Sequence, residues 1–186
     1  MLTSAQAPAV PRLTYLRIKN YRALRDVEFR DLTPLTVLIG PNGSGKSTVL
    51  DALDFLAEAV RGNLTQAWEK RNRFAGMRTR GSEGDVEFEV EATQKGATVY
   101  YHVAISENEG AVSVKNEELR IGRNEKRIFY RNGNAYNRVN SPIEYLTDFN
   151  TNWGSLQMKD DVYLAYASVL PSDYANSLDK LLAVLV

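Results

Sequence analysis

The run LTVLIGPNGSGKST, residues 35–48, holds the groups best suited to chemistry in this chain. It contains the spacing G-x-x-x-x-G-K-[ST], with Gly40, Gly45, Lys46 and Ser47 at the fixed positions. Its glycines let the backbone bend so that successive N–H groups point into one cavity, with no Cβ in the way. The run therefore predicts an anion site, and a polyphosphate is the anion that suits a lysine and a hydroxyl at this spacing.

Each side chain of the run has an expected role toward a nucleoside triphosphate. The ammonium of Lys46, the catalytic candidate, can bridge the β- and γ-phosphates, and the hydroxyl of Ser47 can ligate Mg²⁺. Thr48 can donate to the α-phosphate. The expected cofactors are ATP and Mg²⁺, and the expected binding residues are Gly40, Pro41, Asn42, Gly43, Ser44, Gly45, Lys46, Ser47 and Thr48. The alternative is a structural turn rich in glycine and serine.

Flanking periodicity places this loop between a strand and a helix. Residues 35–39 are an apolar run of strand length, and apolar side chains recur at helical spacing from Ser47 to about Val60. Upstream, residues 13–21 and 27–29 read as strands, with turns at residues 25–26 and 33–34. Downstream, residues 64–74 predict a weaker helix and residues 76–84 a loop.

Beyond residue 85 the apolar period changes to two. Residues 86–90, 99–105, 112–114 and 119–121 alternate apolar and polar side chains, which predicts an antiparallel meander. The sequence Asn132-Gly133-Asn134 predicts a hairpin turn joining residues 128–131 to 135–139. Helical patterns return at residues 164–170 and 174–186. The predicted fold class is α/β with α+β character, a mixed core sheet beside an antiparallel β-meander.

Composition narrows the class of protein. The chain has 186 residues, 44% hydrophobic and 25% charged, with no cysteine and a formal net charge of zero. No run approaches the ~18 apolar residues of a membrane helix, and residues 1–12 read as a flexible tail without an export signal. We therefore expect a cytoplasmic location and no membrane partner.

One segment concentrates positive charge, and it allows two interpretations. Its basic residues are Arg61, Lys70, Arg71, Arg73, Arg78 and Arg80, and Glu69 is its one acid. Such a run can contact the phosphates of DNA or RNA. It can equally be a solvated connection between a helix and a strand, the commoner origin of a charge run.

Three motifs together carry a family resemblance. Residues 16–24, LRIKNYRAL, precede the loop run, and the helix after the loop opens with Leu50-Asp51-Ala52-Leu53. This pattern resembles the N-terminal lobe of ABC-type P-loop ATPases of the SMC, RecF and OLD kind, including AAA-type ATPases of bacteria. The resemblance implies that Asn20 and Arg22 approach the ATP and that Gln157, or less favourably Gln66, senses the γ-phosphate. Tyr21 between them is expected to pack in the core.

The chain also departs from that family. It contains no signature motif, no apolar strand ending in paired acids and no switch histidine, because Asp160-Asp161 precede their apolar run and His102 lies in the meander. We expect His102 to be a partly exposed strand residue. Residues 13–186 are therefore interpreted as an N-terminal lobe whose C-terminal lobe is missing, and we expect this chain alone to be unable to hydrolyse ATP.

The resemblance implies a function for the complete protein, an ATPase that forms a homodimer around ATP in DNA repair, DNA maintenance or phage defence. An alternative is an ATP-gated binding or regulatory module without its own hydrolysis. A small-molecule kinase is the third interpretation, and the antiparallel meander disfavours it because such proteins usually continue with parallel βα units.

Overall fold

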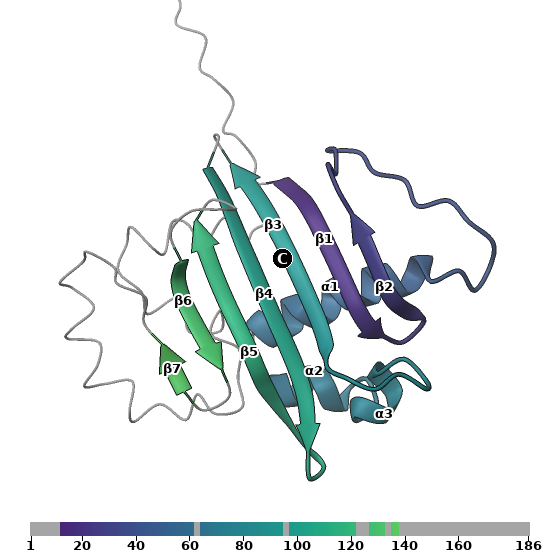
Figure 1. Ribbon diagram of the computed structural model, residues 1–186. Coiled ribbons are helices and arrows are strands. Elements are labelled where there is room, and N and C mark those ends of the chain that lie inside the picture. Colours follow the sequence, from purple (N-terminus) through teal and green to yellow (C-terminus); the bar gives the residue numbers. More distant parts are fainter. Residues whose placement is uncertain (1–11, 62–63, 95–96, 122–126, 133–134, 138–186) are drawn as a thin grey trace, which may run out of the picture.

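The computed structural model describes residues 12–61, 64–94, 97–121, 127–132 and 135–137 (Figure 1). A sheet forms one layer and helices pack against one of its faces. The strands are β1 (Arg12–Tyr21), β2 (Leu24–Phe29), β3 (Val86–Gln94), β4 (Ala97–Asn108), β5 (Ala111–Ile121), β6 (Arg127–Asn132) and β7 (Ala135–Asn137). The helices are α1 (Lys46–Arg61), α2 (Leu64–Glu69) and α3 (Arg73–Met77).

The sheet has the order β2-β1-β3-β4-β5-β6-β7, and every pairing among the described strands is antiparallel. The predicted meander is confirmed, as is the hairpin of β6 and β7. The two short apolar patterns at residues 112–114 and 119–121 belong to one strand, β5. The prediction of a mixed core sheet is wrong for the described residues. Residues 35–39, which were expected to form a strand, have no strand neighbour there.

Alternation along the strands separates a buried face from a charged face. Ile18, Phe88 and Val103 are paired across β1, β3 and β4, and all three are buried beneath the helices. Arg17 points to the other face, where its guanidinium pairs with Asp26 at 2.9 Å. Because the side-chain period of a strand is two, one register fixes both faces at once.

Aromatic rings join α1 to the sheet. Tyr21 lies 6.1 Å from Phe55 of α1 and 5.6 Å from Phe88 of β3, measured between ring centroids, and Phe55 lies 5.6 Å from Phe88. All three rings are buried. The expected core position of Tyr21 is confirmed, and the cluster holds α1 across the sheet.

The predicted strand at residues 35–39 is wrong for the described part of the chain. Figure 1 shows this segment leaving β2 and looping outside the sheet before it enters α1. Leu35, Val37 and Ile39 are 81%, 67% and 91% exposed, and Leu38 alone packs against the core from the opposite side of the segment. Leu35, Val37 and Ile39 alternate along the segment, but no described residue covers their side chains.

Two local predictions also need correction. The predicted turn at residues 25–26 lies instead at Arg22 and Ala23, so β2 is longer at its start than expected. The predicted helix over residues 64–74 is divided into α2 and α3, because Asn72 and Arg73 have left-handed φ angles of 62° and 58°. The predicted start of the helix is confirmed, because α1 begins at Lys46. The predicted helices at residues 164–170 and 174–186, Gln157, and the tail up to residue 11 lie outside the described residues.

Candidate nucleotide-binding site

The glycine-rich loop leads directly into α1. Gly43 and Gly45 have φ angles of 82° and 92°, a region that residues with a Cβ rarely adopt. The amide of Ser44 donates to the carbonyl of Pro41 at 3.2 Å, which closes the turn. The amide of Val49 donates to the carbonyl of Gly45 at 3.0 Å, the first bond of the helix. The loop therefore ends at a helix N-terminus, where free N–H groups and the helix dipole favour an anion.

Lys46 lies across this loop. Its Nζ donates to the carbonyl oxygens of Gly40 at 2.8 Å and Pro41 at 2.7 Å, and lies 3.4 Å from Oγ of Ser44. A Cβ at Gly40 would lie 2.8 Å from that same Oγ, so a side chain at position 40 would collide with Ser44 and displace it. An ammonium at the mouth of an amide-rich loop fits a polyphosphate, so these residues suit ATP.

The hydroxyl groups that follow Lys46 are accessible. Ser47 is exposed and Thr48 is half-buried, both in the first turn of α1. No group of three or more histidine, cysteine or acidic side chains suited to a metal occurs among the described residues. A cation at this site would therefore need the Ser47 hydroxyl together with phosphate oxygens, which is a common arrangement for Mg²⁺.

The turn between β1 and β2 packs against the end of the loop. A Cβ at Gly45 would lie 2.8 Å from Cδ2 of Leu24 and 3.9 Å from Cβ of Ala23. Asn20 lies just before this turn and Arg22 begins it, and they have left-handed φ angles of 54° and 49°. The glycine at position 45 therefore serves close approach as well as backbone conformation.

The structure brings Arg22 near the loop and turns Asn20 away from it. Arg22 pairs through Nη1 with Oδ2 of Asp51 on α1 at 3.0 Å. The side-chain amide of Asn20 donates to the carbonyl of Asp85 at 3.0 Å, at the start of β3. Contact of either residue with a nucleotide stays a prediction, and Gln157 lies outside the described residues.

Asp51 is a junction that the sequence reasoning missed. Its Oδ2 accepts from the hydroxyl of Tyr21 at 2.5 Å and from Arg22, while its Oδ1 accepts from Nε of Arg71 at 3.2 Å. Burial raises the pKa of Tyr21, and the hydrogen bond to Asp51 raises it further. The available signal was the single acid within Leu50-Asp51-Ala52-Leu53, at a position between apolar neighbours.

The basic segment divides into bound and open side chains. Arg71 is 4% exposed and pairs with Asp51, Asp54 and Glu58 of α1. Lys70 pairs with Glu58, and Arg73 pairs with Glu69 at 3.6 Å. Arg71 and Lys70 join the end of α2 to α1, and Arg73 joins α3 to α2. The buried Arg71 therefore has a structural role that neither interpretation anticipated, while Lys70 and Arg73 are 68% and 67% exposed, as a solvated connection predicts.

Arg78 and Arg80 remain available. Both are exposed, and neither has an acidic side chain within ion-pair distance among the described residues. The guanidinium of Arg78 lies 4.7 Å from the ring centre of Phe74. Thr79 between them donates through Oγ1 to the carbonyl of Leu24 at 3.1 Å, so this pair flanks the same turn that contacts the phosphate loop.

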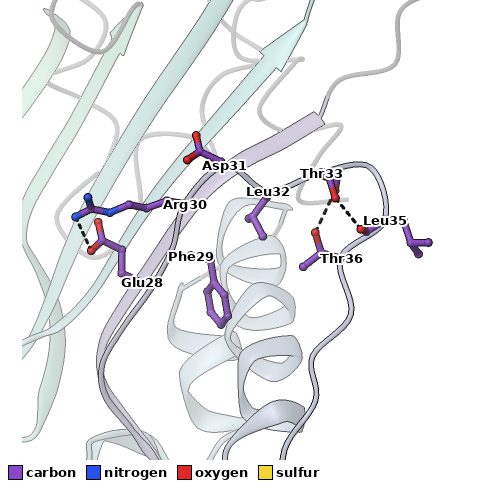
Figure 2. Close-up of a pocket in the computed structure, with 8 residues that line it drawn as sticks. All are labelled: Glu28, Phe29, Arg30, Asp31, Leu32, Thr33, Leu35 and Thr36. Atoms are coloured by element: carbon purple, nitrogen blue, oxygen red, sulfur yellow. Dashed lines mark hydrogen bonds and ion pairs between the residues drawn. The ribbon is translucent and has the colours of Figure 1, made fainter.

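A separate hollow of about 440 Å³ lies where β2 gives way to the extended segment (Figure 2). Figure 2 shows Phe29 and Leu32 directed toward α1, while Leu35 points away from the helix. Arg30 pairs with Glu28 at 2.9 Å beside it. None of the loop residues 40–48 lines this hollow, so it is distinct from the candidate phosphate site.

Two further expectations concern the remainder of the described chain. His102 is a partly exposed residue of β4, as expected, and its Nε2 lies 3.4 Å from a carboxylate oxygen of Glu87. Among the described helices, none combines the length and apolar character that crossing a membrane requires.

Comparison with known proteins identifies the family of the chain. The family model described as AAA ATPase domain matches residues 12–140. The OLD nuclease of Thermus scotoductus is 31% identical over 139 residues, which are 63% of this chain and 26% of that protein. The DNA replication and repair protein RecF of Chlorobium luteolum is 41% identical over 46 residues, 25% of this chain and 12% of the relative.

A third relative is the chromosome partition protein Smc of Methanocaldococcus jannaschii, 33% identical over 67 residues, 36% of this chain and 5% of that protein. The chain thus spans about a quarter or less of the length of these relatives. The family match covers well over half of the chain and includes the loop, the turn before it and the meander after it. The chain belongs to the AAA ATPase domain family, within the ABC-type P-loop ATPases of the SMC, RecF and OLD class.

Proposed function

We propose that this chain is the ATP-binding N-terminal lobe of an SMC-, RecF- or OLD-like ATPase that acts in the cytoplasm in DNA repair, DNA maintenance or phage defence. The observation that carries the proposal is the glycine-rich loop at the start of α1, with Nζ of Lys46 held at the carbonyls of Gly40 and Pro41. On binding, that ammonium exchanges two carbonyl oxygens for the more strongly negative phosphate oxygens.

Within this site the residues have separate tasks. The amides of residues 43–48 cradle the phosphates, Lys46 neutralises them, and Ser47 holds the Mg²⁺. The bound Mg²⁺ would supply charge neutralisation at the β- and γ-phosphates. Arg22 reaches the phosphates from the neighbouring turn, where its guanidinium already lies beside α1.

Hydrolysis is assigned to the complete protein. The exposed apolar side chains of Leu35, Val37 and Ile39 support this assignment, because a strand of this composition is normally buried on both faces. We propose that the missing C-terminal lobe covers them and brings the acid that the chain lacks, and that the complete protein forms a homodimer. The alternative is an ATP-gated module without hydrolysis, which binds ATP equally well but gains no turnover when that lobe is supplied.

Titration of the purified chain with ATP and Mg²⁺ in a calorimeter tests the proposal. Lys46→Ala should weaken binding at least about tenfold, the loss expected for a charge-assisted bond to phosphate. Lys115→Ala is the matched control, because Lys115 pairs with Asp85 at 2.8 Å on the sheet and lies outside the loop. Equal affinity of the two variants would remove Lys46 from the site, and undetectable binding by the unmodified chain would reject the proposed function.

The open pair Arg78 and Arg80 supports a second role, contact with the phosphates of double-stranded DNA. Neutralising two phosphates should give a salt dependence of log K against log salt with a slope of roughly −2 from these residues alone. The double variant Arg78→Ala with Arg80→Ala should lose that part of the slope. Arg73→Ala is the control, because Arg73 is already paired with Glu69. DNA binding that is unchanged in the double variant would assign the pair to solvent.

A further inference from the structure

The turn at residues 20–24 has an unfavourable backbone that tertiary bonds must hold. Asn20 and Arg22 both adopt left-handed φ angles, which are unfavourable for residues with a Cβ and more so for arginine than for asparagine. The amide of Arg22 donates to the carbonyl of Met77 at 2.5 Å, and the amide of Thr79 donates to the carbonyl of Asn20 at 3.0 Å. These bonds fix the turn to the end of α3 and to Thr79 beyond it, but neither reaches α1.

Besides the packing of Tyr21 on Phe55, the turn is joined to α1 by polar contacts to one residue, Asp51. Asp51 lies on α1 five residues beyond Lys46 and accepts hydrogen bonds from Tyr21 and Arg22 of the turn. Its other oxygen accepts from Arg71, whose remaining nitrogens bind Asp54, Glu58 and the carbonyl of Ala67. The buried guanidinium therefore fixes the orientation of Asp51, and Asp51 fixes the turn.

The same turn is the surface on which the phosphate loop rests. Leu24 lies so close to Gly45 that a Cβ there would approach its Cδ2 to 2.8 Å. A turn that moves away from α1 therefore also releases the last loop residue before the helix. We infer that Asp51, through its bond to Tyr21, is a positioning residue for the phosphate loop. The inference rests on the proposed nucleotide site.

Two substitutions separate this role from simple stabilisation. Asp51→Asn keeps the shape of the side chain, and Tyr21→Phe removes one hydroxyl while keeping the ring contacts with Phe55 and Phe88. Asp54→Asn is the matched control, since it removes a negative charge from the same helix and touches Arg71 but no residue of the turn. Any general effect of charge on a polyphosphate is therefore present in the control.

The experiment measures the affinity for ATP with Mg²⁺ by calorimetry, well below the unfolding temperature, and the unfolding midpoint without nucleotide. We expect Asp51→Asn to weaken affinity about tenfold and Tyr21→Phe about threefold, with Asp54→Asn within twofold of the unmodified chain. The double variant at positions 21 and 51 should weaken affinity by less than the product of the two single effects, because both changes act on the hydrogen bond between Tyr21 and Asp51.

A fall in the unfolding midpoint with unchanged affinity in both variants would overturn the inference and leave Asp51 as a stabilising contact only. If Asp51→Asn does not fold, Tyr21→Phe still decides the question through its own affinity. If Lys46→Ala loses binding while both variants keep it, the proposed function stands and the inference fails. If the unmodified chain does not bind ATP, both fail.

Discussion

The exposure of residues 35–39 predicts how much substitutions there change the free energy of unfolding. Val37→Thr with Ile39→Thr replaces apolar by polar surface at side chains that are already 67% and 91% exposed. In this chain the double substitution should change the free energy of unfolding by less than about 0.5 kcal/mol, as for surface positions in general. In a longer polypeptide that buries both side chains, the same change should cost about 2 to 4 kcal/mol.

Urea denaturation monitored by tryptophan fluorescence measures both values. Ile18→Ala is the control for a core position, since Ile18 is 0% exposed in β1, and it should cost about 2 to 5 kcal/mol in either polypeptide. A loss above about 1 kcal/mol from the double substitution in this chain would contradict its exposure. An unchanged stability in the longer polypeptide would refute the idea that the remainder of the protein covers this segment.

Three further predictions concern the described contacts. Arg71→Leu should lower the unfolding free energy by about 2 to 4 kcal/mol in urea, because it leaves partly solvated carboxylates without their shared cation. Gly45→Ala should lower stability and ATP affinity more than Gly43→Ala, since both have positive φ but only position 45 meets Leu24; equal effects would mean that backbone strain alone acts. Burial alone would raise the pKa of Glu58, but the hydrogen bonds and positive charges of Arg71 and Lys70 together outweigh burial and hold that pKa below its ordinary 4.5. The stability from this pair should therefore be present above about pH 4.5 and fall as the pH drops below it, and Arg71→Leu should flatten that fall in unfolding curves recorded between pH 6 and pH 3.

The sequence predicted those parts of the fold whose signals are local. The glycine positions and the helical spacing after Ser47 placed the loop and α1, because backbone conformation and helix amphipathicity are properties of short windows. The alternation of apolar side chains likewise predicted β3, β4 and β5. In each case the residues that determine the element lie within it.

Long-range contacts decided the rest. The turn lies at Arg22 rather than at residues 25–26 because bonds to Met77 and Asp51, both distant in sequence, hold left-handed residues there. The burial of Arg71 depends on three acids of α1 at helical spacing, which a count of charges in a window cannot reveal. Likewise, the apolar side chains at residues 35–39 predict that this segment needs a surface to cover it. Whether such a surface is present depends on residues elsewhere in the fold.

The described contacts support the glycine-rich loop on one side and leave the segment before it exposed. Every strand pairing in the described part is antiparallel, so β1 to β7 form their backbone hydrogen bonds with one another and need no parallel strand. The glycine-rich loop at residues 40–45 is held from one side, by α1 and by the turn that packs on Gly45. The exposed segment that leads into the loop, Leu35 to Ile39, has no such support among the described residues. A loop held on one side can still bind phosphate, because its amides and Lys46 lie at the start of α1. We therefore expect this chain to bind nucleotide and turnover to require a partner surface that covers residues 35–39.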